Sequence, residues 1–128
     1  MKKIITSENA PLPIGPYSHG NLVPASGNML FVSGQVAKDA KTGELTLGDI
    51  KSETAKVMSN VKAILTDGGM EFKHVVKTTI FLKDLNDFAA VNEVYGSFFQ
   101  GNFPSRETVQ VSRLPLDVNV EISVIAVN

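Results

Sequence analysis

The sequence predicts an α+β domain in which two helices cover one face of a sheet. Two stretches repeat apolar residues at the three- and four-residue steps of a helix. The stretches around them are rich in β-branched residues or alternate between apolar and polar positions, as strands do. The predicted order of elements is therefore β-β-β-α-β-α-β-β. Because the chain has 128 residues and no visible linker or repeat, we expect one domain spanning residues 1–128.

The N-terminal third is predicted to hold three strands separated by loops. A short first strand is followed by residues 10–17, which contain three of the six prolines and favour an ordered loop without helix. Residues 22–23 and 29–32 are predicted as two strands joined by a turn at residues 26–28, Ser-Gly-Asn. Residues 38–48 carry Gly and Asp at loop positions and predict a surface loop.

Both helices have recognisable boundaries. The first is expected to begin after Asp49, a good N-cap residue, and to end at Gly68-Gly69. The second is expected to begin near Asn86 or Asp87 and to close at residues 101–102, Gly-Asn. One side of the second helix carries mostly apolar residues, with a single amide among them: Phe88, Val91, Asn92, Tyr95, Phe98 and Phe99.

The remaining strands are predicted at residues 75–82, 108–111 and 118–127. In the last of these, Ile125 and Val127 share a face with Glu121, opposite the face that alternation gives to the core. Two helices cover only one side of the sheet, so an apolar face is left over. An exposed apolar face of this kind usually contacts a partner. We therefore expect a homo-oligomer with pockets at its subunit contacts.

Composition excludes several classes of function. The net charge of −1 argues against nucleic-acid binding, which draws its affinity from Lys and Arg. Without Cys the chain has no disulfide and no thiolate nucleophile, and two histidines, His19 and His74, argue against a multi-histidine metal site. No secretory signal or membrane-spanning stretch is visible, so a cytoplasmic protein is expected. Chemistry must then rest on Arg, carboxylates, Tyr, Ser/Thr and backbone groups.

Arg106 and Glu121 are the strongest candidates for a functional site. Arg106 follows Pro104 and lies just before a predicted strand, where a guanidinium held at the strand edge is suited to bidentate capture of a carboxylate or phosphate. The alternative is a surface Arg paired with Glu107. Glu121 lies in mid-strand, where desolvation would make it a proton acceptor for water. The alternative for Glu121 is a salt bridge across a subunit contact.

Three further positions are weaker candidates. Asn92 would either lend a polar group to a pocket or bond to backbone groups of a neighbouring loop. Tyr17, in Gly-Pro-Tyr-Ser, would either aim its hydroxyl at a ligand or pack against the core. Gly34 would either allow a ligand close to the backbone or mark a bulge.

Motifs along nearly the whole chain resemble those of the RidA/YjgF/UK114 family, in its reactive-intermediate deaminase branch. Each motif is modest by itself, but their number and order over one domain make the resemblance specific. The matching stretches are residues 14–18 (IGPYS), 31–35 (FVSGQ), 60–65 (NVKAIL), 76–85 (VKTTIFLKDL), 88–95 (FAAVNEVY), 103–106 (FPSR), 111–115 (VSRLP) and 120–122 (VEI).

The resemblance implies a chorismate-mutase-like fold assembled as a homotrimer, with a central barrel of sheets and three clefts between subunits. It also implies hydrolysis of 2-imino acids such as 2-iminobutanoate and 2-iminopropanoate, or their enamine tautomers, to 2-oxo acids and ammonia. Pyridoxal-phosphate enzymes such as threonine and serine dehydratases release these imines, and the deaminase itself needs no cofactor. The alternative function is a non-catalytic carboxylate-binding, regulatory or chaperone-like trimer that uses the same cleft.

The resemblance also assigns roles to residues. Arg106 would hold the carboxylate of the substrate, Glu121 would orient or activate the water, and Tyr17 would hydrogen-bond near the imine. The pocket would be completed by Asn92 and by the backbone around Gly34 and Thr108. The chain departs from the family pattern at Glu107, where a small residue is usual. Strand alternation predicts that Arg106 and Glu107 point to opposite sides of the sheet.

Overall fold

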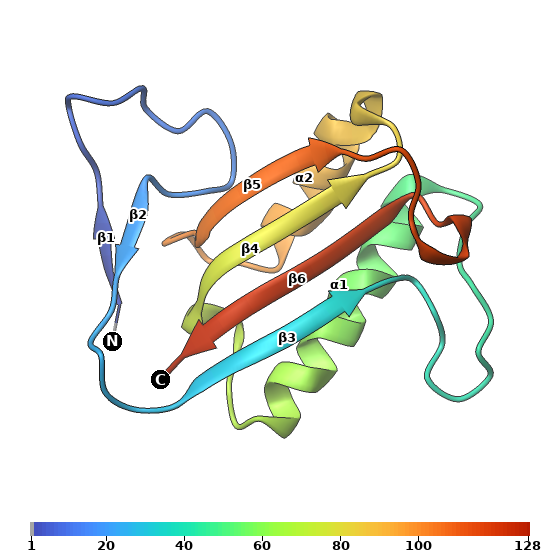
Figure 1. The fold of residues 1–128 in the computed structure, drawn as a ribbon, viewed down its shortest axis with the longest axis horizontal. Helices are drawn as coiled ribbons and strands as arrows, with labels where there is room; N and C mark the ends of the chain where they lie inside the picture. The colour runs from blue at the N-terminus through green and yellow to red at the C-terminus, as the bar shows by residue number, and fades with distance from the viewer. Residues whose placement is uncertain (1) are drawn as a thin grey trace.

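Both helices lie against one face of a four-stranded sheet in the computed structural model, which describes residues 2–128 (Figure 1). The strand order is β3 (Met29–Gln35), β6 (Val120–Val127), β4 (Val75–Leu82) and β5 (Ser105–Gln110). β6 runs antiparallel to both of its neighbours, and β4 and β5 are parallel. The predicted α+β class and element order are confirmed.

Helix α1 (Ile50–Asp67) has the predicted boundaries. The side chain of Asp49 accepts hydrogen bonds from the backbone N–H groups of Lys51 and Ser52, and the helix ends at Gly68. Helix α2 (Phe88–Ser97) is shorter than predicted. A 3-10 turn over Leu85–Asp87 precedes it, and it ends four residues before Gly101. The reason is that Phe98 and Phe99 leave the helix to pack their rings against Phe72.

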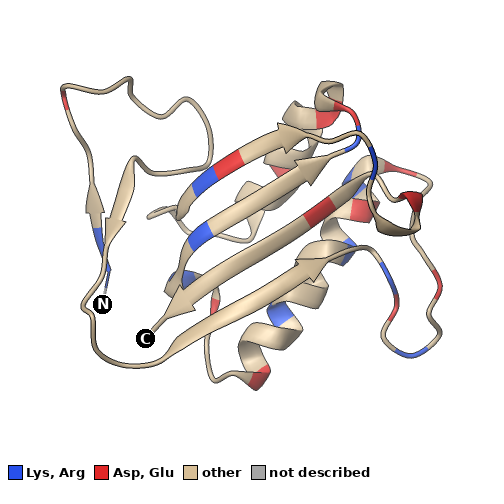
Figure 2. Ribbon diagram, in the orientation of Figure 1, with Lys and Arg blue, Asp and Glu red and all other residues tan. Residues whose placement is uncertain are grey.

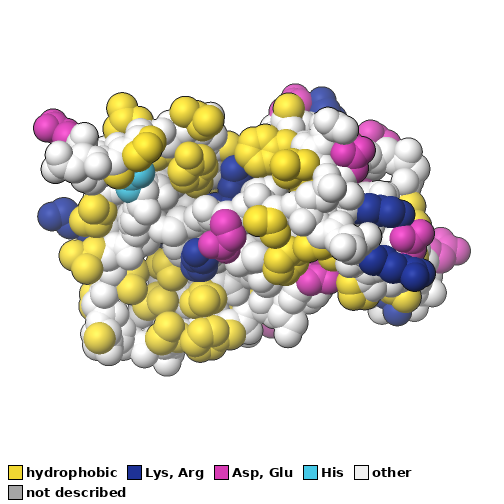
Figure 3. All heavy atoms as spheres, turned by 45° about the horizontal axis from the view of Figure 1, so that its top comes forward, with side chains coloured by type: hydrophobic (Ala, Val, Ile, Leu, Met, Phe, Trp, Pro, Cys, Tyr) yellow, Lys and Arg dark blue, Asp and Glu magenta, His cyan; other side chains and the backbone are white. Residues whose placement is uncertain are grey.

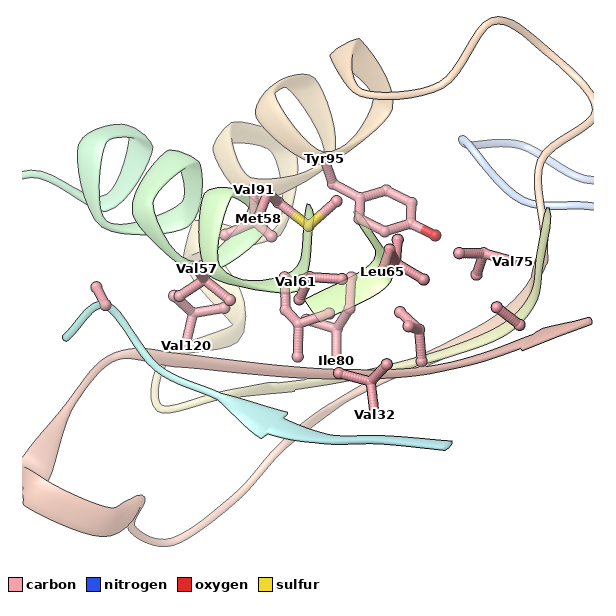
Figure 4. Close-up of a cluster of buried hydrophobic side chains, with 14 of the residues drawn as sticks. Val32, Val57, Met58, Val61, Leu65, Val75, Ile80, Val91, Tyr95 and Val120 are labelled. Atoms are coloured by element: carbon pink, nitrogen blue, oxygen red, sulfur yellow. The ribbon is translucent and has the colours of Figure 1, made fainter. Parts of the chain in front are cut away.

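The core fills the space between the helices and the sheet (Figure 4). Side chains from α1 and α2 meet the inward side of β4 and β6: Val57, Met58, Val61, Leu65, Val91, Tyr95, Ile80, Ile122 and Val124. On β6 every second residue from Val120 to Ala126 is buried, as the alternation predicts. This burial decides which side chains of β6 face away from the helices, and Glu121 is one of them.

The N-terminal strands pair differently from the prediction. β1 (Lys3–Ile5) and β2 (Gly20–Leu22) form a separate two-stranded sheet, so β2 ends before the predicted residue 23 and does not pair with β3. The side chain of Asn21 donates hydrogen bonds to the Ser105 hydroxyl (3.2 Å) and the Phe103 carbonyl. These bonds hold β2 beside the start of β5, and β3 is left to pair with β6.

The face of the sheet opposite the helices is uncovered among residues 2–128. It bears exposed apolar side chains on β3, where Met29 is 59% and Phe31 is 67% exposed, and partly buried Ile125 and Val127 on β6. Figure 2 shows few charged positions on β4 and β6, one adjacent basic and acidic pair on β5, and none along β3. We call this surface the open face. In the part of the chain that the structure describes, no helix is long and apolar enough to cross a membrane.

Candidate functional site

Arg106 lies on the edge strand β5 and points toward the helices. Its Nη1 donates a hydrogen bond of 2.7 Å to Oδ1 of Asn92 on α2. Its partner in the β4 register is Thr78, which is fully buried and accepts a hydrogen bond from the hydroxyl of Tyr95. Asn92 therefore bonds to a side chain, and the predicted alternative of backbone partners is wrong.

Three aromatic rings surround the guanidinium group of Arg106. Its central carbon lies 5.2 Å from the ring centroid of Tyr95, 5.6 Å from that of Tyr17 and 5.8 Å from that of Phe88. Burial lowers the pKa of Arg106, and no carboxylate forms an ion pair with it among residues 2–128. The guanidinium keeps its charge, and within the described residues only one of its donors has a hydrogen-bond partner. The other donors are available to bind an anion.

The loop before β2 is fastened to the start of β5, and this brings Tyr17 to Arg106. The backbone N–H of Ser18 donates to the Pro104 carbonyl (3.1 Å), and its hydroxyl donates to the Phe103 carbonyl. A Cβ added at Gly15 would lie 3.8 Å from Nη2 of Arg106, so the backbone closely approaches the guanidinium there. Figure 3 shows several groups of apolar side chains on this side of the molecule. Leu12 and Ile14 of this loop are exposed, as are Leu85 and Phe88 around the start of α2.

His19 closes the same loop, a role that sequence reasoning missed. Its Nδ1 accepts a hydrogen bond from the backbone N–H of Ser7 (3.0 Å), so its Nε2 carries the proton and donates to the Pro11 carbonyl (2.5 Å). The ring thus joins the end of the loop that carries Tyr17 to Ser7 near its start and to Pro11 within it. The one signal in the sequence was the position of His19 directly after the Gly-Pro-Tyr-Ser segment.

Glu107 points away from Arg106, as strand alternation predicts. Its carboxylate accepts hydrogen bonds of 2.6 Å from the ammonium group of Lys77 and from the hydroxyl of Thr79, both on the neighbouring strand β4. The hydrogen bond from Lys77, followed by that from Thr79, lowers the pKa of Glu107. The alternative in which Arg106 pairs with Glu107 is therefore wrong, and Glu107 leaves the charge of Arg106 intact.

Glu121 lies on the open face, against Gly34. In the β6–β4 register it stands opposite Phe81, and its strand neighbours Val120 and Ile122 face the core. The register of β3 shifts between Val32 and Gln35, and this irregularity brings Gly34 close to Glu121. A Cβ at Gly34 would lie 2.7 Å from the carboxylate carbon of Glu121. A side chain at residue 34 would displace the carboxylate.

Within one chain the candidate residues form two groups on opposite faces of the sheet. Tyr17, Asn92 and Arg106 lie together on the helix side, whereas Gly34 and Glu121 lie together on the open face. Thr108 is two residues beyond Arg106 on β5 and shares its side. The hydroxyl of Thr108 is buried and has no hydrogen-bond partner in residues 2–128. One chain therefore does not bring Arg106 and Glu121 to a common ligand.

Two other polar residues have structural or solvent-exposed positions. Asn60, on α1, donates hydrogen bonds to the carbonyl groups of Val36 and Lys38 and so holds the loop after β3. Arg113 is exposed. No group of three or more His, Cys, Asp or Glu side chains that could hold a metal ion occurs among the described residues.

Comparison with known proteins identifies the family. The sequence profile of the family described as endoribonuclease L-PSP matches residues 7–128. A RutC family protein of Pyrococcus horikoshii is 52% identical over 98% of this chain and 98% of its own length. The 2-iminobutanoate/2-iminopropanoate deaminase of Escherichia coli K12 is 47% identical over 99% of this chain and 98% of its own length.

The fold is also shared with solved structures. The crystal structure of Escherichia coli TdcF with bound serine has a TM-score of 0.76 and 44% identity, and the match covers 98% of each chain. The agreement of the sequence profile, the curated relatives and the fold extends over almost the entire chain. The chain belongs to the endoribonuclease L-PSP family, the RidA/YjgF/UK114 family whose motifs its sequence resembles.

Proposed function

We propose that this protein hydrolyses 2-imino acids, such as 2-iminobutanoate and 2-iminopropanoate, and their enamine tautomers to 2-oxo acids and ammonia. The observation that carries the proposal is the guanidinium of Arg106, which is half-buried, unpaired with any acid in residues 2–128, and oriented by Asn92. Such a group binds the carboxylate that every 2-imino acid carries through charge-assisted hydrogen bonds.

The relatives support this proposal. The Escherichia coli relative at 47% identity is named as a deaminase of two 2-imino acids. The TdcF structure holds serine, a ligand with the same α-carboxylate.

In the proposed reaction the bound imine is attacked by water. Glu121 accepts a proton from the water as the water oxygen bonds to C2 and the π electrons of the C=N bond move to nitrogen. Glu121 then returns that proton to the nitrogen, which gives a tetrahedral carbinolamine. In the second step Glu121 passes the hydroxyl proton of the carbinolamine to the amino group, the C–N bond breaks, ammonia leaves, and the carbonyl of the 2-oxo acid forms. Carbon is neither oxidised nor reduced, so the step needs no redox cofactor. Proton transfer by a positioned group contributes roughly 10²–10⁴-fold, which suits a substrate that water already attacks.

The proposal includes a homotrimer in which each cleft lies between two chains. Arg106 and Glu121 lie on opposite faces of one sheet, so one substrate meets both only where the helix-side edge of one chain approaches the open face of another. The apolar side chains of the open face, such as Phe31, supply the surface that such an assembly would bury. In this arrangement the sheets form the central barrel that the family resemblance implies.

In the test, threonine dehydratase generates 2-iminobutanoate in situ, and semicarbazide traps the imine that remains, so that the lifetime of the imine can be measured. The wild-type protein is expected to shorten the lifetime of the imine. Arg106→Ala is expected to lose about 10- to 100-fold in kcat/KM, because a hydrogen bond to a charged group contributes roughly 1.5–3 kcal/mol. Arg113→Ala is the matched control, since Arg113 is exposed and is the only other arginine of the chain.

Three other results would change the proposal. An unchanged lifetime of the imine with the wild-type protein excludes the deaminase. Equal activity of Arg106→Ala and wild type removes the role given to Arg106 but leaves the enzyme. Saturable binding of 2-oxobutanoate without turnover supports the non-catalytic carboxylate-binding protein instead.

A further inference from the structure

Glu53, on α1, is the only fully buried charged side chain among residues 2–128, and it belongs to neither group of candidate site residues. Both of its carboxylate oxygens are used. Oε1 accepts a hydrogen bond of 2.7 Å from the side-chain amide of Asn119. Oε2 accepts bonds of 2.8 Å from the backbone N–H of Asn119 and 3.2 Å from that of Val120.

The carboxyl group of Glu53 is surrounded by hydrogen-bond donors. All three groups that face it are N–H donors, and it forms no ion pair with a Lys, Arg or His in the described part of the chain. Its place in the first turn of α1 adds the favourable field of the helix N-terminus. Burying a carboxylate is costly unless its hydrogen bonds are made, so the contact with residues 119–120 is a specific one.

This contact fixes the point at which β6 begins. Asn119 is held from a second side, because its carbonyl accepts a hydrogen bond of 3.0 Å from the backbone N–H of Lys83. The chain reaches Asn119 from a strained turn, in which Leu116 and Asp117 have φ angles of +59° and +53°. An anchor directly after that turn sets the register of the strand that follows.

Glu121 comes two residues after Asn119 and one after Val120. A slip of one residue would exchange the two faces of β6 and turn Glu121 toward the core. Smaller shifts would move its carboxylate away from Gly34. The place of Glu121 on the open face therefore depends on the anchored segment just before it.

We infer that Glu53 is a positioning residue for Glu121. Its hydrogen bonds to residues 119–120 fix the position of the Glu121 carboxylate, which accepts the proton from water in the proposed reaction. The inference rests on the proposed function, because it concerns the half of the site that performs proton transfer. Arg106 is on another strand and binds the substrate carboxylate by itself. Loss of the hydrogen bonds between Glu53 and residues 119–120 is therefore expected to lower turnover and to leave binding of the substrate carboxylate unchanged.

The test compares Glu53→Ala and Glu53→Gln in the imine assay, with Glu44→Gln as a control that changes an exposed glutamate. We expect kcat of Glu53→Ala to fall about 10- to 100-fold, the effect of small misplacement of a reacting group. The dissociation constant of 2-oxobutanoate, measured by calorimetry, is expected to change less than about threefold. Hydrogen exchange at the amides of Asn119 and Val120 is expected to accelerate in Glu53→Ala alone.

Glu53→Gln is expected to restore most of the turnover. Its carboxamide oxygen accepts from the backbone N–H groups of Asn119 and Val120, and the Asn119 side chain turns to accept from its NH2 group. If Glu53→Ala fails to assemble, Glu53→Asp replaces it, because the shorter carboxylate cannot reach both partners and lowers kcat in the same selective way.

Wild-type kcat in Glu53→Ala or Glu53→Asp overturns the inference while the proposed function stands. A parallel loss of turnover and 2-oxobutanoate binding also overturns it, since it indicates general damage to the fold. Absence of turnover in the wild-type protein overturns the proposed function and the inference with it.

Discussion

The Arg106 region and the Glu121 region are built from different kinds of structure. Arg106 lies on an edge strand, and the groups around it come from a loop and from α2, through Tyr17 and Asn92. Glu121 lies on β6, which is bonded to a strand on each side, and it is bounded by backbone at Gly34. The Arg106 region is therefore held together by side chains and a loop, and the Glu121 region by the backbone hydrogen bonds between strands.

This difference suggests that the two regions have different functions. A loop held by a few hydrogen bonds, such as those of Ser18 and His19, opens more easily than a central strand. A substrate must enter and leave at the carboxylate-binding group, whereas a group that activates water must stay within hydrogen-bond reach of its target. The Arg106 region, which we call the adjustable region, thus suits recognition of the substrate. The Glu121 region, which we call the rigid region, suits proton transfer.

The largest effect is expected from mixing two variants that each lose most of their activity. Arg106→Ala chains keep Glu121, and Glu121→Gln chains keep Arg106. If each cleft takes one residue from each of two neighbouring chains, a random equal mixture has both residues intact in about one cleft of four. The mixture, co-expressed with two different tags and assayed with semicarbazide, should regain about a quarter of wild-type activity, although each variant alone loses almost all of it.

A second mixture gives the control. Wild-type chains mixed equally with chains carrying both substitutions also leave about a quarter of the clefts intact if clefts are shared. If instead both residues served a cleft from the same chain, this mixture would keep about half of the activity and the first mixture none. That pattern would contradict the assignment of the two regions to different chains.

A smaller effect is expected when the rigid region is disturbed by one methyl group. The Cβ of Gly34→Ala would meet the end of the flexible Glu121 side chain, so the carboxylate rotates away and the fold is kept. We expect kcat to fall roughly 10-fold, with 2-oxobutanoate affinity unchanged. Gly48→Ala is the matched control, because a Cβ there meets no atom within 4 Å. Equal kcat in Gly34→Ala and Gly48→Ala would show that Glu121 does not take part in the reaction.

The sequence predicts the rigid region better than the adjustable one. Alternation along β6 identifies the buried face from Val120 to Ala126, and so the outward direction of Glu121, because a central strand against helices has a strict period of two. Helix α1 is bounded by Asp49 and Gly68, residues whose capping chemistry is local. Local signals of this kind need no knowledge of distant partners.

The parts that could not be predicted depend on contacts between distant residues. Arg106 and Thr108 lie on an edge strand whose burial pattern is irregular, so the sequence does not say which of its faces meets the helices. The rings around Arg106 come from residues 17, 88 and 95, which only the folded chain brings together. β1 and β2 are three residues long, too short for a pattern that specifies their partner.

The smallest effect is expected at the turn that leads into β6. Leu116 is 57% exposed and has a φ of +59°, which costs a non-glycine residue about 1–2 kcal/mol. Leu116→Gly removes that strain but adds about 0.5–1 kcal/mol of freedom to the unfolded chain, so a net stabilisation near 0.5 kcal/mol is expected. Chemical denaturation measures it, against Leu12→Gly, an exposed leucine without positive φ that should lose stability. Turnover of Leu116→Gly should stay at the wild-type level, because Glu53 anchors residues 119–120 whether or not the turn is strained. A large fall in kcat would show instead that the strain in the turn determines the position of Glu121.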